Sequence, residues 1–184
     1  MRSLTLAFAT ILGLGTLFCL TPITTPQNSR TSRPAAHAVS KQIDNTVKSI
    51  NRTLPQLKKT EKELTGTDEG GYLIVWRNAT GVVKVIEWLG LSNNNLQTVY
   101  YFHNRRLICA KQERQYFLLN ETTGNLDRRK PGHRTTATYY FQNRRLVQYV
   151  GEGKGQAAAS ILKDAAWALR LAAAPGKSLH LHDF

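Results

Sequence analysis

Three acidic residues stand where a carboxylate could take part in acid–base chemistry. Glu87 falls within an apolar, strand-like segment, whereas Asp68 and Glu69 are adjacent in a turn that contains several glycines. A carboxylate acts as a general acid or base when a cleft shifts its pKa toward neutrality. Glu87 is the acid to inspect first, because a carboxyl on a half-buried strand needs a partner. One hypothesis is therefore a secreted hydrolase that uses Glu87 or Asp68/Glu69, although solvation explains Asp68 more simply and hydrogen bonding to the turn explains Glu69.

The cysteines and histidines give weaker evidence for a metal site or a nucleophile than the acids give for acid–base chemistry. His180, His182 and Asp183 have the spacing of a strand ligand set, but no further ligand accompanies them. Cys109 remains the one thiol if Cys19 is removed with the N-terminal segment, and on a strand it is best explained as a small buried apolar residue. No phosphate-binding glycine loop, HExxH motif or serine nucleophile elbow occurs. The sequence therefore predicts no metal site and no cofactor.

Arginines and tyrosines form the remaining candidate site, and they belong to a repeat. The octapeptide YYFHNRRL at 100–107 returns as YYFQNRRL at 139–146, with seven of eight positions matching at a spacing of 39. Each copy is typical of a strand, a two-residue turn and a return strand, and Asn suits the positive φ of the first turn position. Gly is usual at the second position, so Arg there strains the backbone. The candidate binding residues are Tyr101, Tyr140, Arg105, Arg106, Arg144, Arg145, Arg128, Arg129 and Lys130.

A basic and aromatic surface of this kind fits an anionic partner. The chain has a net charge of +13, which attracts polyanions, and Arg beside Tyr binds phosphates and glycans. We therefore predict a non-enzymatic protein that binds an anionic polymer, such as lipopolysaccharide or a polyanionic glycan, or an envelope protein through one sheet face. The plainer alternative is that the basic turns keep the sheet soluble and the tyrosines cover it.

Alternation along the repeat predicts two faces of a sheet. Phe102 is expected opposite Leu107 and Tyr100 opposite Cys109, and the second copy follows the same rule, with Tyr139 opposite Gln148. The residues expected on the core face are Tyr100, Phe102, Leu107, Cys109, Tyr139, Phe141 and Leu146. Those expected on the other face are Tyr101, His103, Ile108 and Tyr140.

Helices are expected before and after the sheet. Apolar residues from Val39 to Leu57 recur at spacings of three and four, with Pro55 as a break, and the charged residues of 58–63 would form a solvated helical face. A polar loop is expected over 120–134. The alanine-rich helix Gln156–Ala174 should pack weakly and leave a mobile tail. The predicted fold is α+β, with an N-terminal amphipathic helix packed on an antiparallel β-meander of about six strands and an Ala-rich C-terminal helix.

The chain divides into four predicted parts. Residues 1–20 are a signal segment, because Arg2 precedes an uncharged run from Leu4 to Leu20. Residues 21–38 are a disordered linker, 39–152 a helix plus β-meander domain, and 153–184 a C-terminal helix and tail. We expect a periplasmic or secreted protein with no membrane span in the mature chain. The alternatives are a retained N-terminal membrane anchor and a lipoprotein attached through Cys19.

The order of these motifs resembles a family of small exported proteins of unknown function from Gram-negative bacteria. The resemblance rests on Glu69-Gly70-Gly71 before the sheet and on the two Y-Y-F-x-N-x-x-L hairpins, and it covers roughly residues 40–152. The hairpins are also remotely similar to MORN-like and antitoxin-component repeats, which implies a further alternative, a toxin-inhibitor or immunity-like protein. Arg105 and Arg144 stand where the family has Gly. The resemblance implies a fold and supplies no catalytic residue.

Overall fold

The computed structural model describes residues 33–120 and 123–181 of the chain. The signal segment predicted at 1–20 and most of the linker predicted at 21–38 therefore lie outside the described residues. The described residues belong to one compact unit, Thr31–Phe184. None of the described helices is both long enough and apolar enough to cross a membrane.

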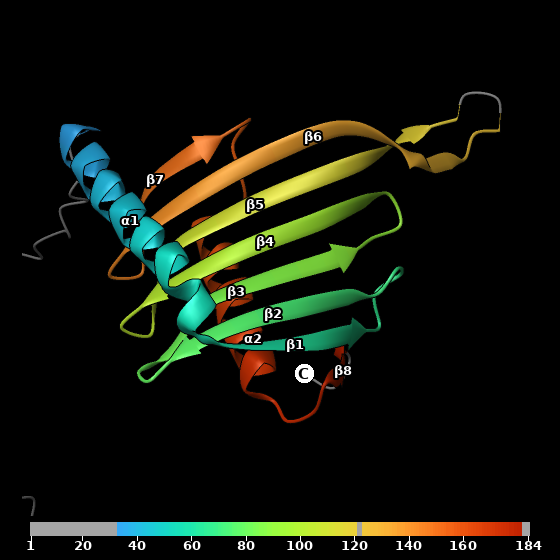
Figure 1. The fold of residues 1–184 in the computed structure, drawn as a ribbon. Helices are drawn as coiled ribbons and strands as arrows, with labels where there is room; N and C mark the ends of the chain where they lie inside the picture. The colour runs from blue at the N-terminus through green and yellow to red at the C-terminus, as the bar shows by residue number, and fades with distance from the viewer. Residues whose placement is uncertain (1–32, 121–122, 182–184) are drawn as a thin grey trace, which may run out of the picture. The chain divides into compact units, whose positions relative to one another are not determined.

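An eight-stranded sheet forms the centre of the fold, in the order β7-β6-β5-β4-β3-β2-β1-β8 (Figure 1). Seven strands follow one another and pair antiparallel: β1 (Lys58–Thr65), β2 (Gly71–Asn78), β3 (Gly81–Gly90), β4 (Asn94–His103), β5 (Arg106–Leu119), β6 (Leu126–Gln142) and β7 (Arg145–Gly151). The last strand, β8 (Ser178–His180), joins β1 in parallel. The α+β class with a mostly antiparallel sheet and two helices is thus confirmed, and the meander has seven strands instead of about six.

The repeated hairpins contain the two-residue turns that the sequence predicts. Asn104 and Arg105 connect β4 to β5, and Asn143 and Arg144 connect β6 to β7. All four residues have positive φ, from 49° to 64°. Positive φ at both turn positions twists the chain in the sense that two antiparallel strands require. Asn tolerates this region, whereas Arg in it is strained.

A β-bulge follows the first turn and shifts the pairing. Phe102 faces Leu107 as predicted, but the next pair is Tyr101 with Cys109, so Tyr100 does not face Cys109. The bulge inserts one extra residue in β5, and a shift of one residue moves a side chain to the other face. Cys109 therefore packs with Tyr101, and its predicted place on the core face is wrong.

The second hairpin has a bulge at the equivalent position. Tyr139 faces Tyr149 and not Gln148 as predicted. Leu146, which was expected in the core, is 38% exposed. The repeat therefore duplicates the bulge as well as the turn.

Helix α2 (Ala158–Ala173) covers the sheet face that carries the first aromatic residue of each repeat. Its alanines allow a close approach to bulky aromatic rings on the sheet, so the expectation of weak packing is wrong. The four aromatic residues of the repeat that were predicted to be core are buried under it. This group consists of Tyr100, Phe102, Tyr139 and Phe141, and the helix contributes Ile161, Ala165, Ala168, Leu171 and Ala172.

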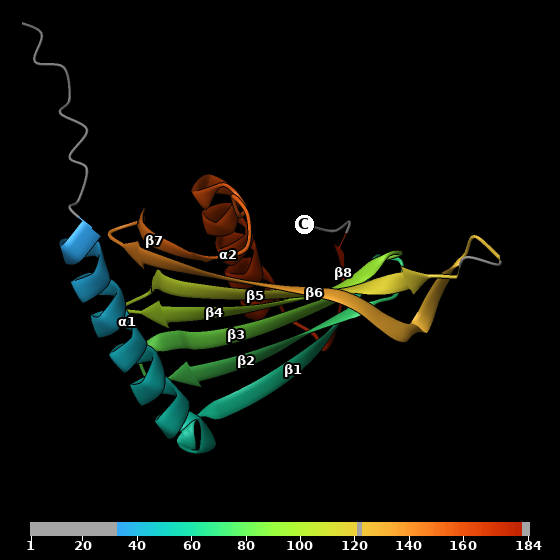
Figure 2. The same ribbon diagram turned by 90° about the horizontal axis from the view of Figure 1, so that it is seen from above.

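Helix α1 (Arg33–Thr53) packs on the opposite face of the sheet, as Figure 2 shows. Ile43 and Val47, four residues apart, place their side chains against Tyr101, Cys109 and Tyr140. Figure 1 shows that α1 crosses the sheet near the end where the hairpin turns lie. Each of the two sheet faces is therefore covered by one helix.

The ends of α1 differ from the prediction. The helix begins at Arg33, inside the segment expected to be a linker, and a short 3-10 turn, η1 (Leu54–Gln56), follows it. Pro55 lies in this turn, and beyond it the charged segment forms β1 and not a helical face. Strand alternation then buries Lys62 and Leu64, while Glu61 and Glu63 stay exposed.

The two segments expected to be irregular are partly strands. Residues 126–134 belong to β6, so the loop that follows β5 is shorter than predicted. The tail forms β8, where Leu179 pairs with Leu64 and is only 5% exposed. Burial of Leu179 explains why this part of the tail is ordered.

Candidate functional site

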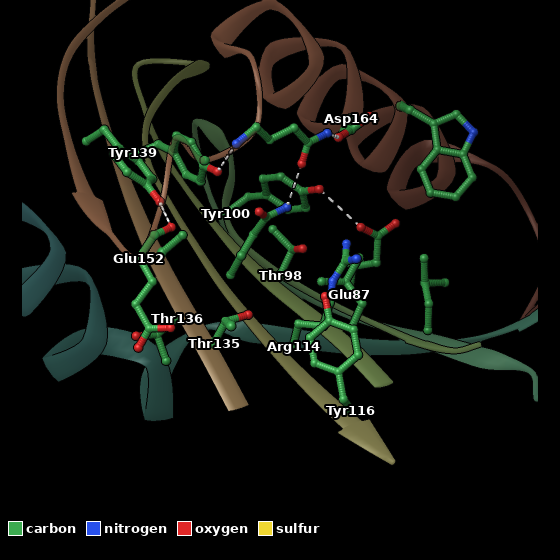
Figure 3. A pocket seen from close by; sticks show the side chains of 18 residues that line it. Glu87, Thr98, Tyr100, Arg114, Tyr116, Thr135, Thr136, Tyr139, Glu152 and Asp164 are labelled. Carbon is green, nitrogen blue, oxygen red and sulfur yellow. Dashed lines mark hydrogen bonds between the residues drawn. The ribbon is translucent and has the colours of Figure 1, made fainter. Parts of the chain in front are cut away.

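Helix α2 divides the sheet face beneath it, and a pocket of about 540 Å³ lies along one flank of the helix. Asp164 and Trp167, three residues apart, form that flank, because positions three apart share one side of a helix. The sheet supplies the floor, and the segment that leads from β7 into α2 supplies a wall. Figure 3 shows the lining side chains, most of which carry a hydrogen-bonding group.

The floor of the pocket is built from residues that are neighbours across four strands. Glu87 on β3 faces Thr98 on β4, and Thr98 faces Gln112 on β5. The adjacent row places Arg114 beside Leu96. Cross-strand neighbours of this kind share one face, so the polar side chains converge beneath α2. The face is therefore apolar toward the hairpin turns and polar toward the opposite end of the strands.

Glu87 is the most unusual group in the pocket. It is only 5% exposed, and the Tyr100 hydroxyl donates a hydrogen bond of 3.1 Å to its Oε2. Its Oε1 is buried and has no hydrogen-bond partner among the described residues. Burial raises the pKa of the Glu87 carboxyl to about 7; the Tyr100 hydrogen bond opposes this rise and the negative Asp164 adds to it. Near neutrality the carboxyl thus has an oxygen that can either donate or accept a hydrogen bond.

Tyr100 holds Glu87 in place and remains protonated. Burial raises the pKa of its hydroxyl strongly, and the charges of Glu87 and Asp164 raise it further. The hydroxyl is therefore a permanent donor toward Glu87, as Figure 3 shows. Tyr100 acts here as a positioning residue.

Gln156 closes the pocket from the segment before α2. Its backbone N–H donates to the Tyr139 hydroxyl at 2.8 Å, and its side-chain amide donates to Asp164 at 2.9 Å. The Gln112 side-chain amide donates to the side-chain Oε1 of Gln156 at 3.2 Å. Gly155 has a φ of +65°, and a Cβ there would lie 2.5 Å from the Tyr149 ring. The glycine-rich segment between β7 and α2 is therefore a pocket wall that requires glycine at 155.

Charge in the pocket differs from charge in the chain as a whole. Glu87, Glu152 and Asp164 line it, against one cation, Arg114. The chain carries a net charge of +13, so this pocket is an acidic region in a basic protein. Anionic ligands are disfavoured here, and neutral polar ligands or cations are favoured.

Tyr101 and Tyr140, predicted to form an exposed binding face, are instead buried under α1, with 5% and 8% exposure. The Tyr140 hydroxyl donates to Asp44 at 3.1 Å, and burial followed by the Asp44 charge raises its pKa to about 12. The Tyr101 hydroxyl donates to Asn51 at 3.4 Å. The prediction of their exposure is wrong because the chain has a helix for each face of the sheet.

The structure brings four of the predicted arginines together. Arg105 and Arg106 belong to the β4–β5 turn region, and Arg144 and Arg145 to the β6–β7 turn region. All four are exposed, and Arg106 donates to the Asn143 side chain at 3.3 Å, which joins the two turns. None of the four forms an ion pair with another described residue.

The predicted basic run Arg128, Arg129 and Lys130 lies at the start of β6. The β6–β7 turn is at the opposite end of that strand, so the run does not join the turn arginines (Figure 1). Arg128 is paired with Glu69, and Lys130 lies 3.7 Å from an Asp127 oxygen. The side chain of Arg129 lies outside the described residues.

The acids of the glycine-rich turn have structural partners. Asp68 is exposed and accepts hydrogen bonds from the Ser92 hydroxyl and from the Ser92 backbone N–H at 3.1 Å. The hydroxyl bond is the main cause of its lowered pKa. Asp68 thus connects the β1–β2 turn to the β3–β4 loop, and Glu69 connects the same turn to Arg128 on β6. Neither acid lines the Glu87 pocket.

Sequence reasoning identified Glu87 and missed the residues that surround it, among them Thr98, Gln112, Arg114, Gln156, Asp164 and Trp167. A signal for one of them was present, because strand alternation from Tyr100 places Thr98 on the core face. Gln112 and Arg114 reach that face only because the bulge shifts the register of β5 by one residue. Polar residues on a face that is otherwise buried indicate a site or a partner.

Cys109 is fully buried, and burial raises the pKa of its thiol to about 12. A thiol of this kind is a packing residue and a poor nucleophile. Within the described ranges, no group of three or more His, Cys, Asp and Glu residues is placed to hold a metal ion. Of the three tail residues that have ligand-like spacing, His182 and Asp183 lie outside those ranges.

Comparison with protein-family models, curated proteins and solved structures gives no match to this chain. The resemblance to exported Gram-negative proteins and to MORN-like repeats therefore stays a prediction. The same holds for the toxin-inhibitor alternative.

Proposed function

We propose that the protein is a binding protein that holds a small polyhydroxylated molecule, of the saccharide class, in the Glu87 pocket. The observation that carries this proposal is the buried Glu87 carboxyl, which has one oxygen held by Tyr100 and the other without a partner inside a pocket of about 540 Å³. A buried polar atom without a partner is unfavourable unless a ligand or water completes it. With the predicted export signal, this describes an envelope protein that binds polar ligands.

The lining favours hydroxyl-rich ligands over other small molecules. Hydroxyl groups both donate and accept, which matches Thr98, Gln112 and the half-protonated Glu87. Trp167 and Tyr116 add aromatic surface on which the C–H face of a sugar ring can pack. The acidic balance of the pocket excludes the polyanions predicted from the overall charge as ligands of this site.

Glycan-array screening of the full chain tests the proposal. Wild-type protein should bind a defined set of neutral glycans, and titration calorimetry with the best of them should give saturable binding. Glu87→Met removes both carboxyl oxygens at similar side-chain length, and binding should be lost. Glu87→Gln keeps an acceptor and a donor, so it should retain most of the affinity. Equal binding by wild type and Glu87→Met would refute the site.

Two tryptophan substitutions, one inside the pocket and one on the other sheet face, give a test and its matched control. Trp167→Ala should weaken glycan binding by roughly tenfold or more, in the range of a lost stacking contact. Trp76 is on the other sheet face, beside Lys59 and Lys84. Trp76→Ala should leave glycan affinity unchanged, and an equal loss in both variants would point to general destabilisation.

A hydrolase that uses Glu87 alone is the second candidate function. It keeps Glu87 as a general acid, because a pKa of about 7 beside the Asp164 carboxylate suits proton donation near neutrality. It no longer includes Asp68 or Glu69. Turnover of nitrophenyl glycosides by wild type and its loss in Glu87→Gln would favour catalysis, since that variant is expected to keep binding. Binding without turnover would favour the first candidate.

A further inference from the structure

A second concave site lies on the opposite flank of α2, and it has the opposite charge. Its volume is about 490 Å³, and we call it the arginine groove. The lining residues are Phe102, Arg105, Arg106, Leu107, Asn143, Arg144, Leu162, Ala166 and Leu169. Leu162, Ala166 and Leu169 have helical spacings of four and three, so they form one side of α2.

The groove combines an apolar floor with a cationic rim. Phe102 and Leu107 are buried beneath it, and Leu162 and Leu169 are half-buried along its wall. The rim carries three guanidinium groups, and none of the described residues that line the groove has a carboxylate. A ligand that satisfies both parts has an anionic head and an apolar body.

The arginines of the rim are placed by the fold. Arg105 Nε donates to the Thr80 carbonyl oxygen at 3.3 Å, and Arg106 donates to the Asn143 side chain. Each of these bonds uses one donor, and a guanidinium has five. Donors therefore remain for an anion at the mouth of the groove.

Backbone strain supplies an independent observation. Arg105 and Arg144 have φ values of 60° and 64°, and among the described residues only these and their preceding asparagines have positive φ without being glycine. Glycine would occupy the same turn position with less strain. Strained residues persist where a site needs their side chains, and here both strained arginines line one groove.

We propose that the arginine groove binds a single-chain anionic lipid as a monomer, with its phosphate or carboxylate head on Arg105, Arg106 and Arg144 and its acyl chain along the Leu162 side of α2. This site is separate from the Glu87 pocket, and neither proposal depends on the other. The lipid chemistry also differs from the anionic polymer expected from sequence, because a polymer would use the charge and not the apolar floor.

The test uses the full chain and dodecyl phosphate below its critical micelle concentration, measured by titration calorimetry. Saturable one-to-one binding is expected. Inorganic phosphate, which has the head alone, and dodecyl maltoside, which has a neutral head on the same chain, should each bind roughly tenfold or more weakly. Equal binding of dodecyl phosphate and inorganic phosphate would overturn the lipid proposal, and so would equal binding of dodecyl phosphate and the maltoside.

Two variants locate the site. Arg105→Gly with Arg144→Gly should weaken dodecyl phosphate binding by roughly tenfold or more, and glycine at these turn positions leaves the fold intact. Ala166→Trp places a large side chain at an exposed position of the groove, so it should block the acyl chain and leave inorganic phosphate binding unchanged. If both variants bind dodecyl phosphate like wild type, or if only vesicles containing anionic lipid bind, the proposal is wrong. Glu87→Gln should bind dodecyl phosphate normally.

Discussion

The two flanks of α2 show how one helix can create two sites of opposite character. On one flank, Asp164 faces the Glu87 carboxyl and a polar floor. On the other, Leu162 faces apolar side chains and a rim of arginines. The difference arises in the strands, because the face beneath α2 is apolar near the hairpin turns and polar toward the opposite ends. A helix laid across such a face separates an acidic pocket from a basic groove.

The largest expected effect comes from weakening the packing of α2, the helix that both sites share. Ile161 is fully buried in the core beneath α2, so Ile161→Ala should lower the free energy of unfolding by about 2–5 kcal/mol. Glycan and dodecyl phosphate binding should weaken together. Chemical denaturation and calorimetry measure the two effects.

Ile43→Ala is the matched control, because the same side chain on α1 packs against the other sheet face. It should also lower stability while leaving both binding constants near wild type. If Ile161→Ala weakened the binding of only one of the two ligands, the proposal that α2 forms a wall of both sites would be contradicted.

A pH effect should distinguish the acidic flank from the basic one. The pKa of Glu87 rises from 4.5 in the unfolded chain to about 7 in the fold, so between these values the folded protein retains a proton that the unfolded chain has released. The contribution of protonated Glu87 to the free energy of unfolding is thus fully present below pH 4.5, and it is lost as pH rises through 7. Relative to Glu87→Gln, wild type should lose on the order of 3 kcal/mol across this window. Denaturant midpoints at several pH values measure it, and parallel pH profiles of the two proteins would argue against a buried carboxyl.

A smaller effect is expected at the C-terminal end of α2. Lys62 and Arg77 donate to the carbonyl oxygens of Ala174 and Ala172, which have no partner within the helix. Arg77→Met should lower the free energy of unfolding by about 1–3 kcal/mol. Lys59→Met removes an exposed cation that pairs with Glu61 on the same strand and lies 5.9 Å from the Trp76 ring centroid, and it should change stability little. Equal effects of the two substitutions in thermal denaturation would contradict the anchoring role.

The smallest effect is a gain in stability at the basic flank. Arg105→Gly and Arg144→Gly should each raise the free energy of unfolding by up to about 1 kcal/mol, because glycine adopts positive φ without strain. Arg106→Gly and Arg145→Gly, at the first residue of β5 and β7, should lower it. Differential scanning calorimetry tests this pattern. A loss of stability at 105 and 144 would remove the argument from strain.

Local sequence patterns predicted the hairpins well, because a two-residue turn and strand alternation are set by neighbouring residues. They identified the buried role of Tyr100 and Phe102 and pointed to Glu87. They did not place Cys109, because a single bulge reverses the faces of everything beyond it.

Longer-range features were harder to predict. The charged segment 58–63 contains good helix formers, yet its pairing with β2 makes it a strand. Tyr101 and Tyr140 looked like surface residues because no local pattern shows which face a distant helix will cover. Helix α2 forms one wall of the Glu87 pocket. No local sequence pattern shows that Asp164 lies near Glu87 on β3, so the pocket could not be predicted from the sequence.

The titration of Glu87 tests the central claim most directly. Carbon-13 NMR of the side-chain carboxyl, assigned by comparison with Glu87→Gln, reports its pKa in the folded protein. A titration midpoint near 7 is predicted, because burial disfavours the charged form in the pocket. A midpoint near the ordinary value of 4.5 would show that the carboxyl is solvated, and the proposed site would then fail.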